Sequence, residues 1–428
     1  MGDLPERPIT VLVAGSVLSG LAWSSGSLIF FRVLQGFGGG MLMPLGMTIL
    51  TRAAGPQRVG RVMAVIGVPM LLGPIFGPIL GGWLVDDFSW RWIFFINVPI
   101  GAGAVFLALR VLPRDVEQPT HRLDWLGLAL LSPGLAALIY GLAESGSSGG
   151  FSSAEVWLPM LVGAIMLALF VRHGLRTPDA LIDLRLFKNR TFAVSSLTLT
   201  LVIVSVFGGM LLLPLYLQAV RGESAMDTGL LLAPQGFGAM IAMPIAGRLT
   251  DRTGVGRIVP VGLILVAISF LGLTQLEGDT SYWTFGVLLF VMGLGMGATM
   301  MPTFSGAMQT LRRAAIARAS TTLNINQQVS ASIGTAVLSV LLANALADRL
   351  PGLGGGGIGD AAAVPPAVRA QINGPMAEAF ASTFWWALAL VVIALVVSTA
   401  LLPKEKPEPV DDPADDEAGE AAPVLVPG

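Results

Sequence analysis

Long apolar stretches alternate with short polar segments along almost the whole chain. Each stretch has about 17 to 25 residues, the length that an α-helix needs to cross the hydrocarbon core of a bilayer. A transmembrane β-barrel would show shorter segments of alternating polarity instead. The pattern therefore predicts an all-α polytopic membrane protein. Its twelve expected spans are residues 9–25, 27–50, 62–85, 93–112, 123–143, 154–171, 192–217, 228–247, 258–276, 282–308, 319–345 and 380–402.

The basic residues between these spans predict which way the chain crosses the membrane. With the N-terminus inside, most of the 25 lysines and arginines fall in inside segments. The positive-inside rule then places both the N- and the C-terminus in the cytoplasm. The alternation also supports the span count, because one missed helix would scramble it. The outside segments hold only Arg91, Arg221, Arg349 and Arg369.

Two segments have the composition of chain outside the membrane. Residues 346–379 contain a run of glycines and a pair of prolines, which indicates a flexible external loop. Residues 404–428 combine acidic residues with prolines, which is typical of a disordered cytoplasmic tail. The rest is expected to form an N-terminal helical half over 1–117 with four spans, two linker spans within 118–190, and a C-terminal half of six spans over 191–403.

The stretch from Gly67 to Gly101 differs from the other apolar stretches in its glycines and prolines. It begins GVPMLLGPIFGPILGG, in which glycines recur at every fourth position and so lie on one helical face. Both residue types are poor helix formers in water, but a membrane tolerates them where a neighbouring helix packs closely. The pattern predicts a kinked helix in close contact with another helix. The residues expected at this contact are Gly73, Pro74, Gly77, Pro78, Gly81 and Gly82.

The complete string is more specific than its glycines. It continues with Asp86 and Asp87 and then reads FSWRWIFFINVPIG. A generic small-residue packing helix would explain the glycines alone, but the full string resembles the antiporter motif of the fourteen-helix drug:proton antiporter family of the major facilitator superfamily. In that family GPxxGPxxGG lies on the fifth helix, and WRWIFxINVPIG opens the sixth. The resemblance implies a major facilitator fold, in which this helix would seal the two halves against each other and prevent proton leak.

Three further segments resemble the same family. RVLQGFGGG at 32–40 is similar to its fourth-helix motif, LDWLGLALL at 123–131 to the start of its seventh helix, and GRLTDRTGVGR at 247–257 to the cytoplasmic gate loop of its C-terminal half. Counted back from these motifs, the family's first two helices have no counterpart, so the resemblance implies a chain of fourteen helices less two. A weak repeat, GFGGGMLMP at 36–44 and GLGMGATMMP at 293–302, agrees with the repeated halves of transporter folds.

Arg32 is a charged residue inside a predicted span. It lies roughly 7–8 Å from the outer end of its helix at 1.5 Å per residue, where a charge is costly unless it faces protein or water. One interpretation is that its long side chain snorkels to the outer surface. The other is a fixed positive charge beside a cavity, which would lower the pKa of a nearby carboxylate. The resemblance implies proton coupling for Arg32. Gln35, one turn on, would orient a proton or substrate, or bond a neighbouring helix.

A proton antiporter needs a titratable group within the membrane, and the sequence offers few. None of the 27 acidic residues lies in the middle of a predicted span. Asp124 and Glu144 mark the two ends of the fifth span, and Asp124 is the candidate for proton coupling. In the resembled family an acid near the absent first helix is expected to help carry protons. If the chain is complete, its coupling is therefore expected to be impaired.

Polar and aromatic side chains on the later spans are candidates for lining a substrate cavity. Asn324, Gln327 and Gln328 have the spacing i, i+3, i+4 and so share one helical face. Such amides either hydrogen-bond another helix or form a polar stripe along a cavity. The full candidate set is Gln35, Phe207, Tyr216, Gln235, Asn324, Gln327 and Gln328.

A charged cluster follows the eighth span. An aspartate and arginines at a cytoplasmic helix junction can lock one conformation by charge-assisted hydrogen bonds. The simpler alternative is an ordinary basic inside loop. The spacing and the resemblance favour a gate formed by Gly247, Asp251, Arg252, Gly254 and Arg257.

Composition excludes several other classes of function. Hydrophobic residues make up 54% of the chain and charged residues 12%, which is too apolar for a soluble protein of 428 residues. There is no cysteine, so thiolate metal sites are excluded, and both histidines fall in charged segments. The sequence contains no nucleotide-binding loop and no nucleophile constellation. We therefore expect that the protein is not an enzyme, that it binds no metal, and that it uses the proton gradient and no cofactor.

These observations predict a multi-pass protein of the cytoplasmic membrane that exports hydrophobic or cationic small molecules in exchange for protons, by alternating access. Its expected partners are the small-molecule substrate, protons and the lipid bilayer, with no nucleic acid, and we expect a monomer. Within transport, the alternative is export of a native metabolite. In a different class, the alternative is a truncated relative that does not couple to protons, or a membrane partner subunit.

Overall fold

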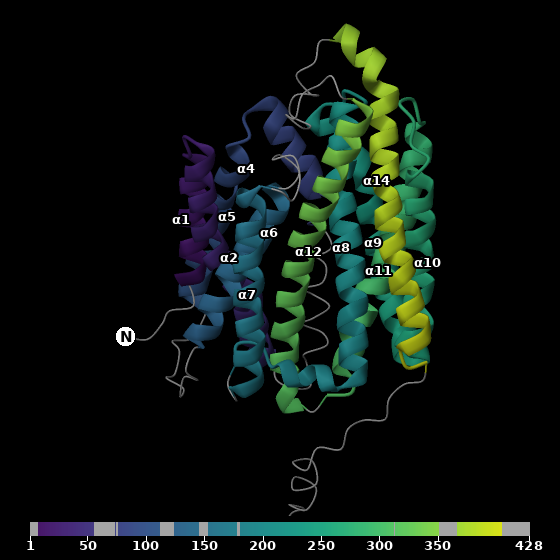
Figure 1. Ribbon diagram of the computed structural model, residues 1–428. Helices are drawn as coiled ribbons and strands as arrows, with labels where there is room; N and C mark the ends of the chain where they lie inside the picture. The colour runs from purple at the N-terminus through teal and green to yellow at the C-terminus, as the bar shows by residue number, and fades with distance from the viewer. Residues whose placement is uncertain are drawn as a thin grey trace, which may run out of the picture. The chain divides into compact units, whose positions relative to one another are not determined.

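The computed structural model describes residues 7–54, 73, 76–111, 124–144, 153–177, 180–311, 313–350 and 366–404. Every regular element in these ranges is a helix, which confirms the predicted all-α fold (Figure 1). Nine helices of the described part are long and apolar enough to cross a membrane, and a shorter apolar helix covers Pro8–Gly20.

The chain forms two compact units. Unit 1 comprises Met1–His121 and Gly222–Gly236, and unit 2 comprises Arg122–Arg221 and Phe237–Gly428. The linker spans therefore belong to unit 2, while α9 (Ala225–Thr253) gives its first part to unit 1 and the rest to unit 2. The boundaries predicted near 118 and 190 describe the halves of the transport fold and stay a prediction.

Unit 1 is built on helices whose backbones meet at glycines. α1 (Arg7–Gly20) packs along α2 (Ser25–Ala54), and a side chain at Gly15 or Gly38 would collide with the backbone of the other helix. α5 (Asn97–Val111) also packs on α1. Small residues allow membrane helices to approach this closely, so short polar side chains can reach from one helix to the next.

A proline divides one predicted span. The helix expected over 93–112 is two helices in the structure, α4 (Trp92–Phe95) and α5, with Ile96 between them. Pro99 has no N–H to donate to the Phe95 carbonyl, and its ring would collide with that carbonyl in a continuous helix. Together the two helices still provide an apolar span, Trp92–Arg110.

Unit 2 is centred on α8 (Arg190–Ala219), which is buried along most of its length. It packs against α11 (Tyr282–Met308), α12 (Arg313–Arg349) and α14 (Pro366–Leu401). Leu199 and Ile203 of α8 share one apolar cluster with Ala307 of α11 and Leu323 of α12. α10 (Val255–Leu273) completes the group by packing on α11 and α14.

The linker pair consists of α6 (Trp125–Glu144) and α7 (Ala154–Arg176), which cross closely at Gly134 and Gly163. The short helix η1 (Leu184–Lys188) leads from this pair to α8. Leu131, Phe170 and Ile182 form a cluster against which Ile325 of α12 packs. Side-chain packing thus attaches the linker pair to α12, in addition to the covalent connection through η1 to α8.

The external loop expected over 346–379 is shorter in the structure. α12 continues to Arg349 and α14 begins at Pro366, so helix replaces both ends of the predicted loop. A proline is favoured at the first position of a helix, because its φ angle is preset and its missing N–H costs no hydrogen bond there. Residues 351–365, most of the predicted span 62–85, and the predicted tail beyond Lys404 lie outside the described residues.

Candidate functional site

A polar network joins three helices of unit 1 around Gln35. Arg32 donates from Nη1 to Oε1 of Gln35 at 2.9 Å, within α2. The Gln35 amide donates from Nε2 to the hydroxyl of Ser16 on α1 at 2.6 Å. Asn97, at the start of α5, donates from Nδ2 to the same hydroxyl at 3.4 Å. The structure thus brings together the predicted pair Arg32 and Gln35 and adds two residues that were not predicted.

The guanidinium of Arg32 is exposed but held in place. Its central carbon lies 5.6 Å from the ring centre of Phe94, within range of a cation–π interaction. Gln35 is buried, so it connects the exposed charge to the hydroxyl between the helices. The arrangement favours a fixed positive charge over a side chain that snorkels freely. The role of Arg32 in proton coupling stays a prediction.

The helix over 76–87 meets the first part of α9 at glycines on both sides. A Cβ atom at Gly82 would collide with the Ala225 carbonyl, and one at Gly229 with the Pro78 carbonyl. Pro78 and Gly82 are four residues apart and therefore share one face of their helix. The close helix–helix contact that the antiporter motif predicts is present here, within unit 1.

The glycines that recur at every fourth position lie on a different face. At Gly73, Gly77 and Gly81 a Cβ atom would meet no described atom within 4 Å. Successive residues of a helix point about 100° apart, so Gly81 faces away from the contact that Gly82 makes. The contact expected along that face is not found among the described residues, and Pro74 lies outside them.

A carboxylate from this contact caps α9. Asp86 accepts from the backbone N–H groups of Ala225 at 3.3 Å and Met226 at 2.6 Å. The Ser224 hydroxyl accepts from the N–H of Asp227 at 3.0 Å and donates to the Asp227 carboxylate at 2.9 Å. The first three N–H groups of α9 therefore have partners, and two of those partners come from another helix.

The predicted gate loop is a sharp corner between two helices. α9 ends at Thr253 and α10 begins at Val255, so Gly254 alone separates them. Gly254 has φ 86° and ψ 157°, a region that is open essentially only to glycine. Its N–H donates to the Thr250 carbonyl at 2.9 Å. The backbone itself thus requires a glycine at this position.

The charged members of the gate motif are less constrained. Arg252 and Arg257 are exposed, and a Cβ atom at Gly247 would meet no described atom within 4 Å. The side chain of Asp251 lies outside the described residues, so the predicted lock by charged groups stays a prediction.

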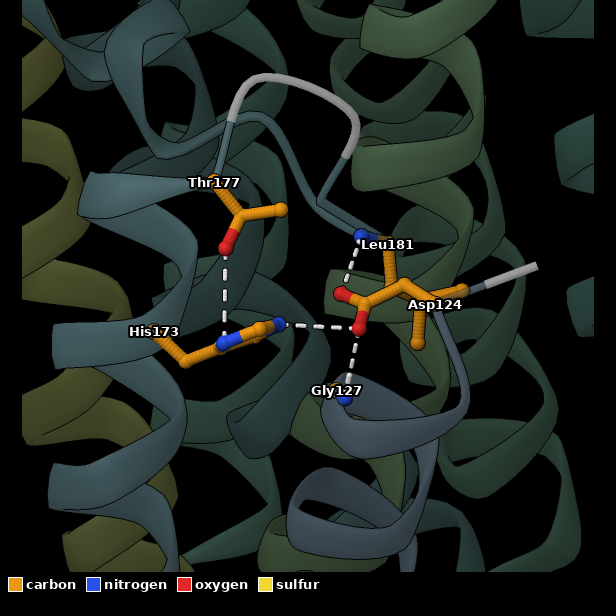
Figure 2. A network of polar contacts seen from close by, with 5 residues as sticks. All are labelled: Asp124, Gly127, His173, Thr177 and Leu181. Carbon is orange, nitrogen blue, oxygen red and sulfur yellow. Dashed lines mark hydrogen bonds and ion pairs between the residues drawn. The ribbon is translucent and has the colours of Figure 1, made fainter. Parts of the chain in front are cut away.

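Asp124 precedes α6 and connects three segments of the chain (Figure 2). Its Oδ1 accepts from the Gly127 N–H at 2.8 Å and lies 2.8 Å from Nε2 of His173, while Oδ2 accepts from the Leu181 N–H at 3.0 Å. The other imidazole nitrogen lies 3.3 Å from the Thr177 hydroxyl. Burial would raise the pKa of the Asp124 carboxyl, but these hydrogen bonds together hold it below the ordinary value of 3.8. Asp124 has a structural task here, and its role in proton coupling stays a prediction.

One face of α12 is polar and exposed within a candidate span. Asn324 and Gln328 are exposed, and Gln327 is half-buried. Thr321 and Ser332 continue the exposed face at spacings of three and four residues. Polar side chains are costly against lipid, so such a face is expected to meet water or protein. The placement favours the stripe interpretation of these amides.

The other cavity candidates differ in exposure. Tyr216 is 1% exposed, its ring packs beside Phe285 and Phe380, and its hydroxyl donates to the Glu277 carbonyl at 2.5 Å. The structure places Tyr216 in the core of unit 2, where neighbouring aromatic rings enclose it, and its role in a substrate cavity stays a prediction. Gln235 is also buried, whereas the ring of Phe207 is exposed.

Comparison with known proteins identifies the family. The sequence profile of the Major Facilitator Superfamily matches residues 6–335. The chain belongs to the Major Facilitator Superfamily. It is a multi-pass membrane transporter, from a family of transporters and not of enzymes.

Relatives of this transporter include drug exporters. The multidrug resistance protein B homolog of Mycobacterium tuberculosis (strain ATCC 25618 / H37Rv) is 44% identical over 418 residues, which cover 93% of this chain and 77% of the relative. The multidrug export protein EmrB of Escherichia coli (strain K12) is 32% identical over 331 residues, which cover 76% of this chain and 64% of EmrB. Both similarities confirm the predicted resemblance to the drug antiporters of this superfamily.

Solved transporters share the fold. A bacterial homolog of the human lysosomal transporter Spinster, in an inward-facing and unoccupied conformation, is 15% identical with a TM-score of 0.57 and matches 95% of this chain and 84% of that one. A D-xylose-proton symporter is 14% identical with a TM-score of 0.58 and matches 95% of this chain and 81% of that one.

Sequence reasoning missed several polar residues of this transporter. The amide that joins α12 to α8 belongs to Asn326, which donates from Nδ2 to the Thr200 hydroxyl at 2.9 Å and to the Ser196 carbonyl at 3.3 Å. Asn97 lies inside the string that carries the family resemblance, and Asp86 lies four residues after Gly82, the last glycine of the motif. Their polarity within or beside apolar stretches was the available signal.

Proposed function

We propose that this transporter exports hydrophobic or cationic small molecules across the cytoplasmic membrane in exchange for protons, by alternating access. The observation that carries the proposal is the 44% identity to the multidrug resistance protein B homolog over 93% of the chain. The proton gradient is the proposed source of energy, and no cofactor is part of the proposal.

Two exposed helix faces support the proposal that the transporter accepts a broad range of substrates. On α2, Val33, Phe37 and Met41 are exposed at intervals of four residues and form an apolar face. On α12, the exposed face carries amides and hydroxyls without a charge. Aromatic rings and flexible thioethers adapt to apolar molecules of different shapes, and neutral polar groups add hydrogen bonds without selecting one charge.

The network around Gln35 supports a role for Arg32 in coupling. A fixed positive charge disfavours a bound proton or cation close to it. Gln35 and Phe94 hold the guanidinium in position, so its charge acts at a defined place in unit 1. We infer that a proton or a cationic substrate is released when it comes near this charge.

The proposal is tested in proteoliposomes that contain a pH-sensitive dye. A fluorescent lipophilic cation is added, and its movement should be accompanied by proton movement in the opposite direction. Arg32→Ala should reduce this exchange by about ten-fold, as expected for the loss of a hydrogen bond to a charged group. Arg172→Ala removes an exposed arginine of α7 and serves as the matched control.

The outcomes separate the alternatives. Exchange at the unaltered rate in Arg32→Ala would remove Arg32 from the mechanism. Binding of the cation without any proton movement would instead favour the alternative of a relative that does not couple to protons.

A further inference from the structure

The helix over 76–87 ends in two adjacent carboxylates that have different surroundings. Asp86 accepts hydrogen bonds from the N–H groups of Ala225 and Met226, the first two residues of α9. Asp87 is also exposed but makes no hydrogen bond or ion pair with a described residue. The two residues therefore have the same charge and nearly the same position, but only one connects two helices.

We propose that Asp86 is a latch residue, which holds the outer end of the helix over 76–87 against the first turn of α9 and must release it whenever the transport pathway opens outward. The proposal rests on the alternating-access transport proposed above. It adds a specific residue, outside the antiporter glycines and the Arg32 network, that controls one step of the cycle.

The glycine contact brings the two helices close enough for this bond to form. Gly82 admits the Ala225 carbonyl, and Gly229 admits the Pro78 carbonyl, so the two backbones touch. Both glycines are buried, whereas the Asp86 carboxylate one turn beyond Gly82 is exposed. Packing thus forms the inner part of the contact, and a hydrogen-bonded cap forms its outer edge.

The cap is suited to a contact that opens and closes. When the two helices separate, the Asp86 carboxylate and the N–H groups at the start of α9 can both be hydrated, because they lie at the exposed edge. These groups are then not left buried without a hydrogen-bond partner. Leaving a buried polar group unpaired would cost free energy. By contrast, the bond from the Ser205 hydroxyl to the Ala387 carbonyl lies in the interior of unit 2 and cannot be replaced by water in this way.

The charges around Asp86 are mostly acidic. Asp87 is its neighbour on the same helix, and Asp227 on α9 accepts from the Ser224 hydroxyl. Glu223 precedes Ser224 in the chain. The basic residue Arg91, five positions after Asp86 in the chain, directs its guanidinium to the Ala22 carbonyl at 3.3 Å and to the ring of Trp90. The partial positive charge at the start of α9 is therefore what favours the Asp86 carboxylate.

The latch is charged at neutral pH. The Met226 N–H is the main cause that lowers the pKa of Asp86 below the ordinary value of 3.8. A carboxylate with a lowered pKa stabilises the contact above its ordinary pKa, and this contribution is lost as the pH falls through the lowered value. Substitution, rather than mild acidification, is therefore the appropriate way to release the latch.

The experiment measures access to the contact directly. The chain has no cysteine, so Ala225→Cys introduces a single thiol between Asp86 and Gly82. A membrane-impermeant maleimide is applied from outside the cell, and the labelling rate is compared among three backgrounds. Asp86→Ala should raise the rate by about five-fold, as expected for a lost helix cap. Asp87→Ala, the matched control, should leave the rate unchanged.

Asp86→Asn provides a second test that perturbs folding less. Its side-chain oxygen still accepts one N–H but carries no charge, so the labelling rate should lie between those of the unaltered chain and Asp86→Ala. Equal labelling in all of these variants would overturn the latch. Efflux of the lipophilic cation is measured in the same cells, and only the Asp86 variants should impair it. If no variant or unaltered protein moves the cation but the labelling differs as expected, the latch contact stands and the proposed transport function fails.

Discussion

At the scale of single residues, the surroundings of a side chain in this transporter decide its task. Asp86 caps a second helix, whereas Asp87 beside it is exposed and bonds no described residue. Asn326 bonds α8, whereas Asn324 two positions earlier is exposed. Neighbouring residues of a helix point in different directions, so a polar residue and its neighbour meet different partners.

The hydrogen bonds of Asp124 lead to a prediction about the stability of the transporter. Asp124→Ala removes the cap of α6 and the bonds to His173 and Leu181, and should destabilise the transporter by about 1 kcal/mol or more. The measurement is thermal unfolding in detergent at pH 7, followed by tryptophan fluorescence. Asp87→Ala removes a carboxylate that is not part of this cluster and should leave the unfolding temperature unchanged.

The stability difference between Asp124→Ala and the unaltered chain is expected to depend on pH. The pKa of Asp124 is below 3.8 in the folded protein, so its contribution to stability is complete above that pH and declines as the pH falls through the lowered pKa. The difference in unfolding temperature between Asp124→Ala and the unaltered chain should therefore shrink as the pH falls below about 4. A difference that grows as the pH falls below about 4 would contradict the assignment.

At the scale of elements, glycine and proline determine where helices end and where they touch. Pro99 divides α4 from α5, and Gly254 alone forms the corner between α9 and α10. Gly82 and Gly229 permit two backbones to meet. Pro99 and Gly254 act through their own backbone and residues four positions away, whereas the contact of Gly82 and Gly229 joins segments that lie far apart in the chain.

The gate corner predicts a difference between two glycines of one motif. Gly254→Ala must place a side chain at φ 86°, which should cost about 1–3 kcal/mol of stability. Gly247→Ala is the control, because its added Cβ atom would meet no described atom within 4 Å. Thermal unfolding should separate the two variants, and equal unfolding temperatures would contradict a strained corner.

The antiporter motif predicts a similar contrast between adjacent positions. Gly82→Ala should push the helix over 76–87 away from α9, because its Cβ atom would collide with the Ala225 carbonyl. Gly81→Ala should be tolerated, since that face is open among the described residues. Efflux of the lipophilic cation should fall by about ten-fold in Gly82→Ala, the size of effect expected from overpacking a close contact. Loss of efflux in Gly81→Ala alone would reverse the assignment of the contact face.

At the scale of the whole molecule, the linker spans belong to a larger unit. The linker pair packs on α12 through the cluster that includes Ile182 and Ile325, and Asp124 ties it to the segment before η1. α9 contributes to both compact units. Contacts between distant segments, and not the order of spans along the chain, thus define the units.

The sequence by itself determined the class of protein and most of its helices. Span length and the excess of basic residues on one side depend only on local composition, so they could be recognised without a structure. The motif from Gly67 to Gly101 likewise identified the family before any comparison. The wrong expectations lay at element boundaries, such as the loop over 346–379, where a proline begins a helix instead of interrupting one.

Only the tertiary structure decided which residues meet. The bond between Asn326 and Thr200 joins residues 126 positions apart, and the bond between Asp86 and Met226 joins residues 140 positions apart. The buried position of Tyr216 depends on Phe285 and Phe380, which lie on two other helices. A periodic pattern indicates which residues share one face of a helix. Which residues of other helices that face contacts depends on how all the helices pack together.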